Sequence, residues 1–233
     1  MSRKTLAQTT LISILLLSGI AANTSSVMAL NYINNGSFEN TNGTFVDNGN
    51  RAMSVPIGST TIPSWQVIDG EIAWIQSPNP NYAVMTPYGS FFLDLTGYHD
   101  SIPYGGVTQN INTVVGGDYI LSFSLGFRNN NFYPSGGPVS AMATAGSTSQ
   151  IFTTDSLGTD NQWRNFQMLF NATSSTTTIS IAGNSAAGVY IGLDNVSVTP
   201  VPFEFSLGQG FLLGTPLFIG LRIYKKKKAA SLN

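Results

Sequence analysis

The strongest constraint on the fold is a two-residue alternation of side-chain type in the middle of the chain. In "DYILSFSLGF" (118–127) an apolar residue occupies every second position from Tyr119 to Phe127, with serine or glycine at most positions between. A β-strand points successive side chains to opposite faces, so this spacing is typical of a strand with one buried face. The three- and four-residue spacing of a helix is scarce between residues 30 and 200.

Further segments alternate in the same way and are bounded by Gly, Asn, Pro or Ser clusters. They lie at 62–76 (two strands), 90–95, 106–112, 163–170, 176–182 and 189–198. About eight to ten short strands predict an all-β chain folded as a β-sandwich, with a jelly roll as the expected form. Trp65 and Trp163 are predicted to fill its core.

The last of these segments changes its buried face partway along. Ile191 and Leu193 occupy odd positions. Val196 and Val198 occupy even positions. A strand accommodates such a shift through an extra residue, so we expect a β-bulge at Asp194–Asn195.

The N-terminal segment 1–29 is predicted to be a secretory signal peptide. Arg3 and Lys4 precede a short apolar core at 11–17, and "VMA" places small residues before a cleavage site after Ala29. This order of charge, apolar core and small residues is typical of export signals. The alternative is a buried N-terminal helix.

The C-terminal segment 201–233 is predicted to attach the chain to a membrane. Its apolar part, 205–221, has seventeen residues without a charge, and the basic cluster 222–228 follows. Seventeen residues is the lower limit for a spanning helix, and basic residues stay on the cytoplasmic side. We therefore expect one C-terminal transmembrane helix, stopped by four lysines: Lys225, Lys226, Lys227 and Lys228. The alternative is a last strand with a basic tail.

The layout of this tail resembles the PEP-CTERM sorting signal, here in a Pro-Phe-Glu variant carried by Pro202, Phe203 and Glu204. The resemblance implies recognition by an exosortase-type membrane enzyme. Such an enzyme would cut near the motif and transfer the protein to the cell surface or the extracellular matrix.

We take the middle segment, 30–200, as one domain. Its distribution of charged residues limits the partners that it can bind. It contains ten acidic residues, three arginines and no lysine. Nucleic-acid binding needs clustered cations, so this balance argues against it. The chain has no cysteine, which excludes disulfides and thiolate chemistry.

A series of motifs resembles a known family. "NYINNGSFEN" (31–40) is similar to the opening of galactose-binding-like jelly rolls, and "IPSWQV", "GSFFLDLTG", "GGVTQNINTVVGGDYILSFSLG" and "VYIGLDNVSV" follow in order. Together they resemble the choice-of-anchor C family, itself similar to the plant cell-wall domain of unknown function 642. The resemblance covers nearly all of 31–199. It implies a galactose-binding-like jelly-roll β-sandwich on an exported, surface-attached protein, without a defined ligand.

The resemblance also implies a structural metal site at Glu39 and Asp194. In related jelly rolls the opening Glu and the Asp of the last strand approach each other and, with backbone carbonyls, hold calcium. Calcium takes six to eight oxygen ligands. The alternative is that Glu39 caps a turn and Asp194 binds backbone amides at the bulge.

Aromatic residues are the candidates for ligand contact, because rings can stack on sugar faces and loops often carry binding residues. Trp74 is one candidate, with the core as its alternative. Loop aromatics supply the others: Tyr82, Tyr88, Tyr98, Tyr104, Phe132 and Tyr133.

No catalytic motif accompanies the single histidine, His99, which follows Asp94 and precedes Asp100. A His–Asp pair can act as a base with its orienting group, but we favour a strand end with Asp94 hydrogen-bonded, followed by a polar loop. We expect an exported, surface-anchored, non-catalytic sandwich that binds extracellular carbohydrate or contributes to the extracellular matrix. The alternatives are a purely structural matrix protein and a glycan-active hydrolase with unrecognised carboxylates.

Overall fold

The computed structural model describes residues 30–79, 85–98, 102–127, 138–155, 162–186 and 190–201. Within these ranges the chain forms eleven strands and their connections. No helix in this described part has the length and apolar character of a membrane span. The predicted signal peptide with Ala29, the sorting motif Pro202–Glu204 and the lysines Lys225–Lys228 lie outside the described residues.

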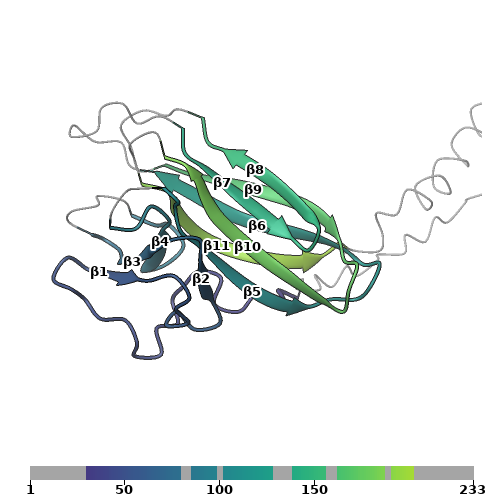
Figure 1. Ribbon diagram of the computed structural model, residues 1–233, viewed down its shortest axis with the longest axis horizontal. Coiled ribbons are helices and arrows are strands. Elements are labelled where there is room, and N and C mark those ends of the chain that lie inside the picture. The colour runs from purple at the N-terminus through teal and green to yellow at the C-terminus, as the bar shows by residue number, and fades with distance from the viewer. Residues whose placement is uncertain are drawn as a thin grey trace, which may run out of the picture.

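Two antiparallel sheets pack face to face (Figure 1). The six-stranded sheet has the order β1 (Ala52–Val55), β3 (Ile72–Gln76), β4 (Phe91–Asp94), β11 (Gly192–Pro200), β6 (Asp118–Phe127) and β9 (Gln162–Asn171). The five-stranded sheet has the order β2 (Gln66–Ile68), β5 (Gly106–Asn112), β10 (Thr176–Ser185), β7 (Ser140–Ala145) and β8 (Thr148–Thr153). The predicted all-β sandwich is therefore confirmed.

The main core lies between the two sheets, where alternate side chains meet. In β6, Tyr119, Leu121, Phe123 and Leu125 are all buried, as the alternation predicts. Trp65 joins them with 2% of its surface exposed, which confirms its predicted place in the core. Burial of apolar area on this scale is the dominant favourable contribution to folding.

Three strands were not predicted from the sequence: β1, β7 and β8. In β7 the buried apolar positions are Ala141, Ala143 and Ala145, which alternate but carry only a methyl group each. In β8 only Phe152 is buried. The hydrophobic contrast between the two faces of these strands is too small for alternation to reveal them.

The predicted bulge in β11 is present. The pairing of β11 with β6 shifts between Asp194 and Ser197, and Asn195 lies in the left-handed region with φ 54°. The extra residue lets Leu193 and Val196 both face the core, although three positions separate them.

The N-terminal segment crosses the bulge, and this explains its Asn-Gly sequence. Val196 N donates to the carbonyl of Gly36 (2.9 Å), and the Asn35 side chain donates to the carbonyl of Pro63 (3.1 Å). A Cβ on Gly36 would lie 1.9 Å from the carbonyl oxygen of Val196. Phe38 is fully buried directly after this crossing. Only glycine fits between the two backbones at position 36.

A second apolar cluster covers the outer face of the six-stranded sheet and corrects the prediction for Trp163. The cluster consists of Ala52, Ala73, Ile75 and Phe92, with Tyr98 and Trp163 packed against it. Trp163 is half-buried and lies outside the main core, because it pairs with Gly126 and shares its outward face. A Cβ on Gly126 would lie 2.6 Å from the indole, and one on Gly192 would lie 3.1 Å from it.

We predict that Gly36→Ala destabilises the sandwich, because the new Cβ meets backbone rather than a movable side chain. The expected loss in free energy of unfolding is about 3 kcal/mol or more, at the upper end for a single substitution. Chemical denaturation measures it. Gly43→Ala is the control: its Cβ meets nothing within 4 Å, but φ is +73°, so backbone strain alone costs about 1 kcal/mol. Equal losses for both variants would contradict the steric explanation.

Candidate functional site

Asp194 lies at the bulge as a fully buried carboxylate on the outward side of β11. The Thr86 hydroxyl donates to its Oδ2, and the backbone amide of Asn195 donates to its Oδ1 at 2.6 Å. Cross-strand pairing places Asp194 opposite Ser124 of β6. The side chain is thus held by hydrogen bonds from two directions and exposes none of its surface.

Burial raises the pKa of Asp194 to about 7, far above its ordinary value of 3.8. The hydrogen bonds from Thr86 and from the Asn195 amide act in the opposite direction. The negative charge of Glu39 is a smaller contribution to the raised pKa, so the structure brings the two predicted carboxylates within electrostatic range of each other.

Glu39 is exposed, in contrast to Asp194. Its Oε1 accepts hydrogen bonds from the backbone amides of Ser90 and Phe91, both at 2.7 Å, at the start of β4. Glu39 therefore ties the N-terminal segment to β4, and Asp194 binds the backbone amide at the bulge. Both contacts match the structural alternative considered for this pair.

The structure corrects the assignment of Trp74 as a ligand-binding residue. Trp74 is fully buried in the main core, where its ring packs against Phe45 (5.5 Å between centroids) and Phe91 (5.7 Å). No face of the indole is open to a ligand. The segment "EIAWIQ" gave no warning, because its apolar residues are nearly continuous and do not alternate.

The loop tyrosines occupy separate places. Tyr88, Tyr98 and Tyr104 are all half-buried. Tyr88 donates to Asn165 Oδ1 at 2.6 Å, whereas Tyr98 contacts the Asn48 amide and has a raised pKa because of its burial. The remaining candidates, Tyr82, Phe132 and Tyr133, lie outside the described residues.

Asp94 ends β4 and is fully buried. Its Oδ1 accepts hydrogen bonds from the Thr96 amide (3.0 Å) and hydroxyl (2.8 Å). This geometry corresponds to the strand-end interpretation of Asp94. The two residues considered with it, His99 and Asp100, lie outside the described part of the chain.

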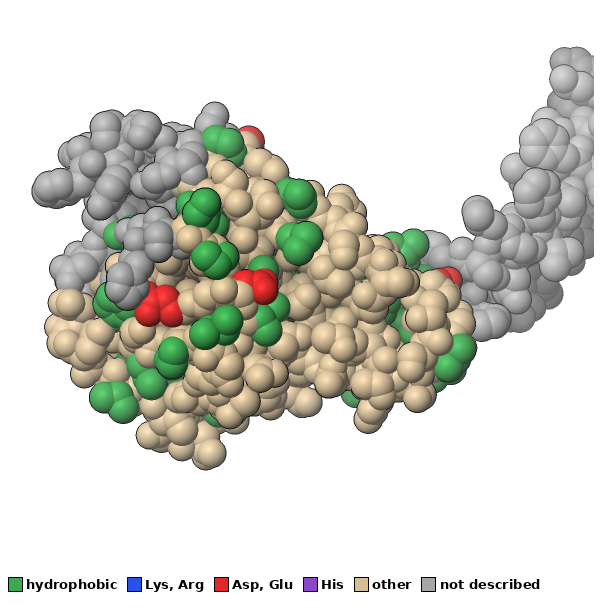
Figure 2. Space-filling view, viewed as in Figure 1, with side chains coloured by type: hydrophobic (Ala, Val, Ile, Leu, Met, Phe, Trp, Pro, Cys, Tyr) green, Lys and Arg blue, Asp and Glu red, His purple; other side chains and the backbone are tan. Residues whose placement is uncertain are grey.

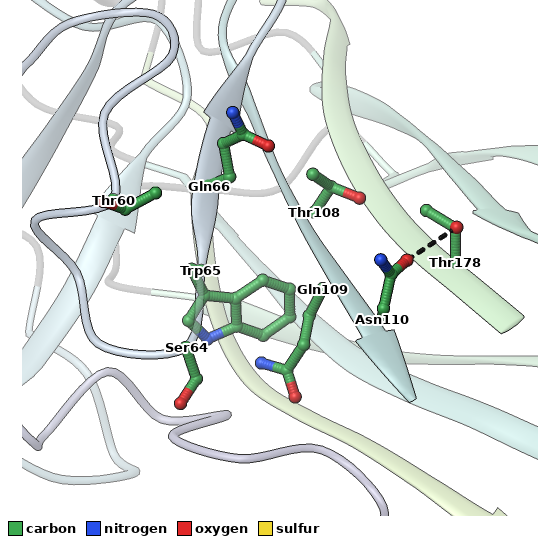
Figure 3. Close-up of a pocket in the computed structure, with 8 residues that line it drawn as sticks. All are labelled: Thr60, Ser64, Trp65, Gln66, Thr108, Gln109, Asn110 and Thr178. Atoms are coloured by element: carbon green, nitrogen blue, oxygen red, sulfur yellow. Dashed lines mark hydrogen bonds between the residues drawn. The ribbon is translucent and has the colours of Figure 1, made fainter. Parts of the chain in front are cut away.

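A groove on the outer face of the five-stranded sheet is a candidate binding site. It has a volume of about 450 Å³, which is within the usual range of ligand pockets. Figure 3 shows the Trp65 ring in the middle of the lining. Thr60 and Ser64 lie on one side of the ring, and the strand residues Thr108, Gln109 and Asn110 lie on the other. Gln66 and Thr178 complete the lining.

The floor of this groove is rigid. Trp65 Nε1 donates to the carbonyl of Asn35 at 2.9 Å. The Gln109 side chain accepts from the amide of Asn34 (2.8 Å) and donates to its carbonyl (3.0 Å). Both floor side chains are thus fixed by the same N-terminal segment that crosses the bulge.

The wall of the groove carries a hydrogen-bond donor held in place. The Thr178 hydroxyl donates to Asn110 Oδ1 at 2.7 Å, which fixes the amide plane of Asn110. Among the described residues no hydrogen bond engages the Asn110 Nδ2 group, and Asn110 is exposed. An amide NH₂ carries two donors, so this group can bind two acceptor oxygens of a ligand.

The lining is uncharged, and the surface shown in Figure 2 has the same character. On that face the described side chains include few acidic groups and no Lys or Arg. The sequence analysis missed this groove. Gln66, Thr108 and Thr178 are polar strand residues far apart in the chain, and only the pairing of β2, β5 and β10 brings them together.

No curated protein sequence matches this chain. Among solved structures it is similar to TmCBM61, solved in complex with beta-1,4-galactotriose: TM-score 0.42, 13% identity, covering 74% of this chain and 100% of that one. It is also similar to a native family 35 carbohydrate binding module from Clostridium thermocellum: TM-score 0.40, 16% identity, covering 63% of this chain and 97% of that one.

A third similar structure is the K1 cleaved adhesin domain of Lys-gingipain from Porphyromonas gingivalis, with TM-score 0.40 and 14% identity, covering 64% of this chain and 97% of that one. The sequence of residues 31–198, which includes the bulge, the N-terminal crossing and the groove, matches the family described as protein of unknown function (DUF642). The chain therefore belongs to the DUF642 family.

Proposed function

We propose that this chain is an exported, surface-attached, non-catalytic protein whose sandwich binds a neutral carbohydrate in the groove of β2, β5 and β10. The observation that carries the proposal is the preset amide donor of Asn110 within an uncharged lining of hydroxyl and amide groups. Carbohydrate hydroxyls both donate and accept hydrogen bonds, and Ser, Thr, Asn and Gln side chains offer both functions without charge.

The lining also favours recognition of a neutral over a charged glycan. Of the described residues only Arg51 and Arg164 are cationic, and neither lines the groove. An acidic polysaccharide would lose hydration of its carboxylates without gaining an ion pair there. The rigid floor adds to affinity because Trp65 and Gln109 lose little freedom on binding.

Export and attachment form the second part of the proposal and rest on the sequence of the two ends. Segment 1–29 has the features of a signal peptide, and segment 201–233 has those of a sorting signal with a membrane span. An exosortase-type enzyme would then transfer the protein to the cell surface or the matrix.

A structural calcium ion at Glu39 and Asp194 forms the third part. The candidate calcium ligands are the carboxylates of Glu39 and Asp194 and the Thr86 hydroxyl, all hard oxygen ligands of the kind that calcium prefers. The described residues contain no group of three or more His, Cys, Asp or Glu side chains suited to a metal, so backbone carbonyls and water would complete the shell. A cation there would offset the burial and repulsion that raise the pKa of Asp194.

We predict that Asn110→Asp weakens glycan binding about tenfold. Aspartate keeps the acceptor for Thr178 but replaces the NH₂ donor, a change worth about 1 kcal/mol or more. Affinity electrophoresis of the full chain in mild detergent, through gels containing β-1,4-galactan, xyloglucan or dextran, measures it, with acidic alginate as the comparison polymer.

Asn112→Asp is the matched control for this substitution. Asn112 is exposed, follows Asn110 on the same face of β5 and lies outside the groove, so its variant is expected to migrate like the unmodified chain. Absence of retardation in every neutral gel, or equal weakening by both variants, would refute carbohydrate binding in this groove.

We predict that the calcium-free protein becomes less stable as pH rises from about 4 to about 7 and that stability then levels off. The pKa of Asp194 is about 7 in the folded chain and ordinarily 3.8, so the folded state holds the proton more tightly across this window. Asp194→Asn removes the titration and flattens the profile. Thermal unfolding in EGTA across this pH range provides the measurement.

Calcium is expected to raise the melting temperature of the unmodified chain at pH 8 and to leave that of Asp194→Asn unchanged. An equal increase in both proteins would place the ion elsewhere. If calcium raised the melting temperature of neither protein, the calcium site would be refuted. The predicted pH dependence of stability would not be affected.

We predict that truncation before Pro202 releases the protein from its native cell into the medium, because the apolar segment and the lysines are then absent. Fractionation and immunoblotting compare it with the full chain. Retention of the truncated protein in the membrane fraction would argue against attachment through this segment.

A further inference from the structure

A second groove lies on the outer face of the other sheet. It has a volume of about 380 Å³ and is built by β6 and β9 together with the bulge of β11. The polar side chains of its lining are Ser122, Ser124, Asn165, Gln167 and Asn195. None of them is charged.

Strand register explains why these side chains face outward. Ser122 pairs with Gln167, and Ser124 pairs with Asn165, so both pairs share one face of the sheet. The intervening Phe123 belongs to the main core. Successive residues of a strand point to opposite faces, which puts the polar pairs on the side away from the core.

Like the first groove, the second contains an asparagine whose side-chain oxygen accepts hydrogen bonds from hydroxyl groups. Asn165 Oδ1 accepts hydrogen bonds from the hydroxyls of Tyr88 (2.6 Å) and Ser124 (2.8 Å), and Ser124 is fully buried. Within the described residues, Asn165 Nδ2 has no hydrogen bond, and Asn165 is exposed. As with Asn110 and Thr178, hydroxyl groups fix an asparagine by its oxygen and leave its two N–H donors for a ligand.

The two grooves lie on opposite sides of the sandwich, because one is on the outer face of each sheet and the main core lies between them. A ligand in one groove therefore leaves the other open. The bulge of β11 contributes to the second groove directly. Asn195, which lies where the pairing of β11 with β6 shifts, is one of its lining residues.

We propose that the groove of β6 and β9 binds a second neutral glycan, so that one molecule joins two polysaccharide chains. This inference rests on the proposed function and extends it from attachment to cross-linking. Asn165 supplies the donors, Gln167 adds a second amide, and Tyr88 and Ser124 position Asn165. Two weak sites on one rigid body give an avidity for a polymer network that neither site has alone.

The test counts binding sites and measures cross-linking with the same proteins. Isothermal titration of the full chain in mild detergent uses tetrasaccharides of β-1,4-galactan, xyloglucan and dextran. Light scattering then follows mixtures with the corresponding polymers. The variants are Asn165→Asp, which keeps an acceptor for both hydroxyls, and Gln167→Ala, which does not touch that network. Gln150→Ala on β8, exposed and outside both grooves, is the control.

The unmodified chain and Gln150→Ala are expected to bind two equivalents and to raise scattering. Asn165→Asp and Gln167→Ala are expected to weaken one of the two sites about tenfold, to abolish cross-linking and to leave the other site unchanged. Asn110→Asp is expected to weaken the other site instead.

Two outcomes would overturn the inference, and they differ from failure of the proposed function. One equivalent bound, lost in Asn110→Asp and unchanged in Asn165→Asp and Gln167→Ala, would leave a single groove and refute the second. Two equivalents with both sites intact in the β9 variants would place the second site elsewhere. Absence of binding to all three tetrasaccharides would instead defeat the proposed function itself.

Discussion

The crossing of the N-terminal segment over the bulge of β11 is the constraint on which the other features depend. Its hydrogen bond from Val196 to Gly36 holds the strand where its register shifts. On the inner side, the shift lets β11 keep facing the core before and after the bulge. On the outer side it sets the position of Asp194 and brings Asn195 to the β6–β9 groove. The same crossing fixes Trp65 and Gln109 in the other groove, so one short segment organises both faces.

The sequence was sufficient where side chains differ strongly in polarity along one strand. The alternation in β6 predicted a buried row, and the change from Leu193 to Val196 predicted the bulge before any neighbour was known. It was insufficient where buried residues are small, as in β7, or where an apolar run does not alternate, as around Trp74. The grooves could not be predicted, because they depend on which strands are neighbours and alternation carries no such information.

The polar side chains that line both grooves carry no charge. Hydroxyl and amide groups bind through directional hydrogen bonds, whereas exposed charges attract over longer distances and are screened by salt. Contacts of the first kind therefore depend little on ionic strength. The buried Asp194 is the exception, because burial opposes its ionisation and raises its pKa to about 7, so that a large fraction of the group keeps its proton near neutral pH.

The Trp163 ring packs directly against Gly126 and Gly192, and this contact restricts how the sequence can evolve. The indole occupies the volume where side chains at positions 126 and 192 would otherwise stand, and its edge meets Tyr88 and Phe92. A larger residue at either glycine would displace the ring, and a smaller ring would leave a hollow above the sheet. These three positions, on three different strands, are therefore expected to vary across relatives as a unit rather than one at a time.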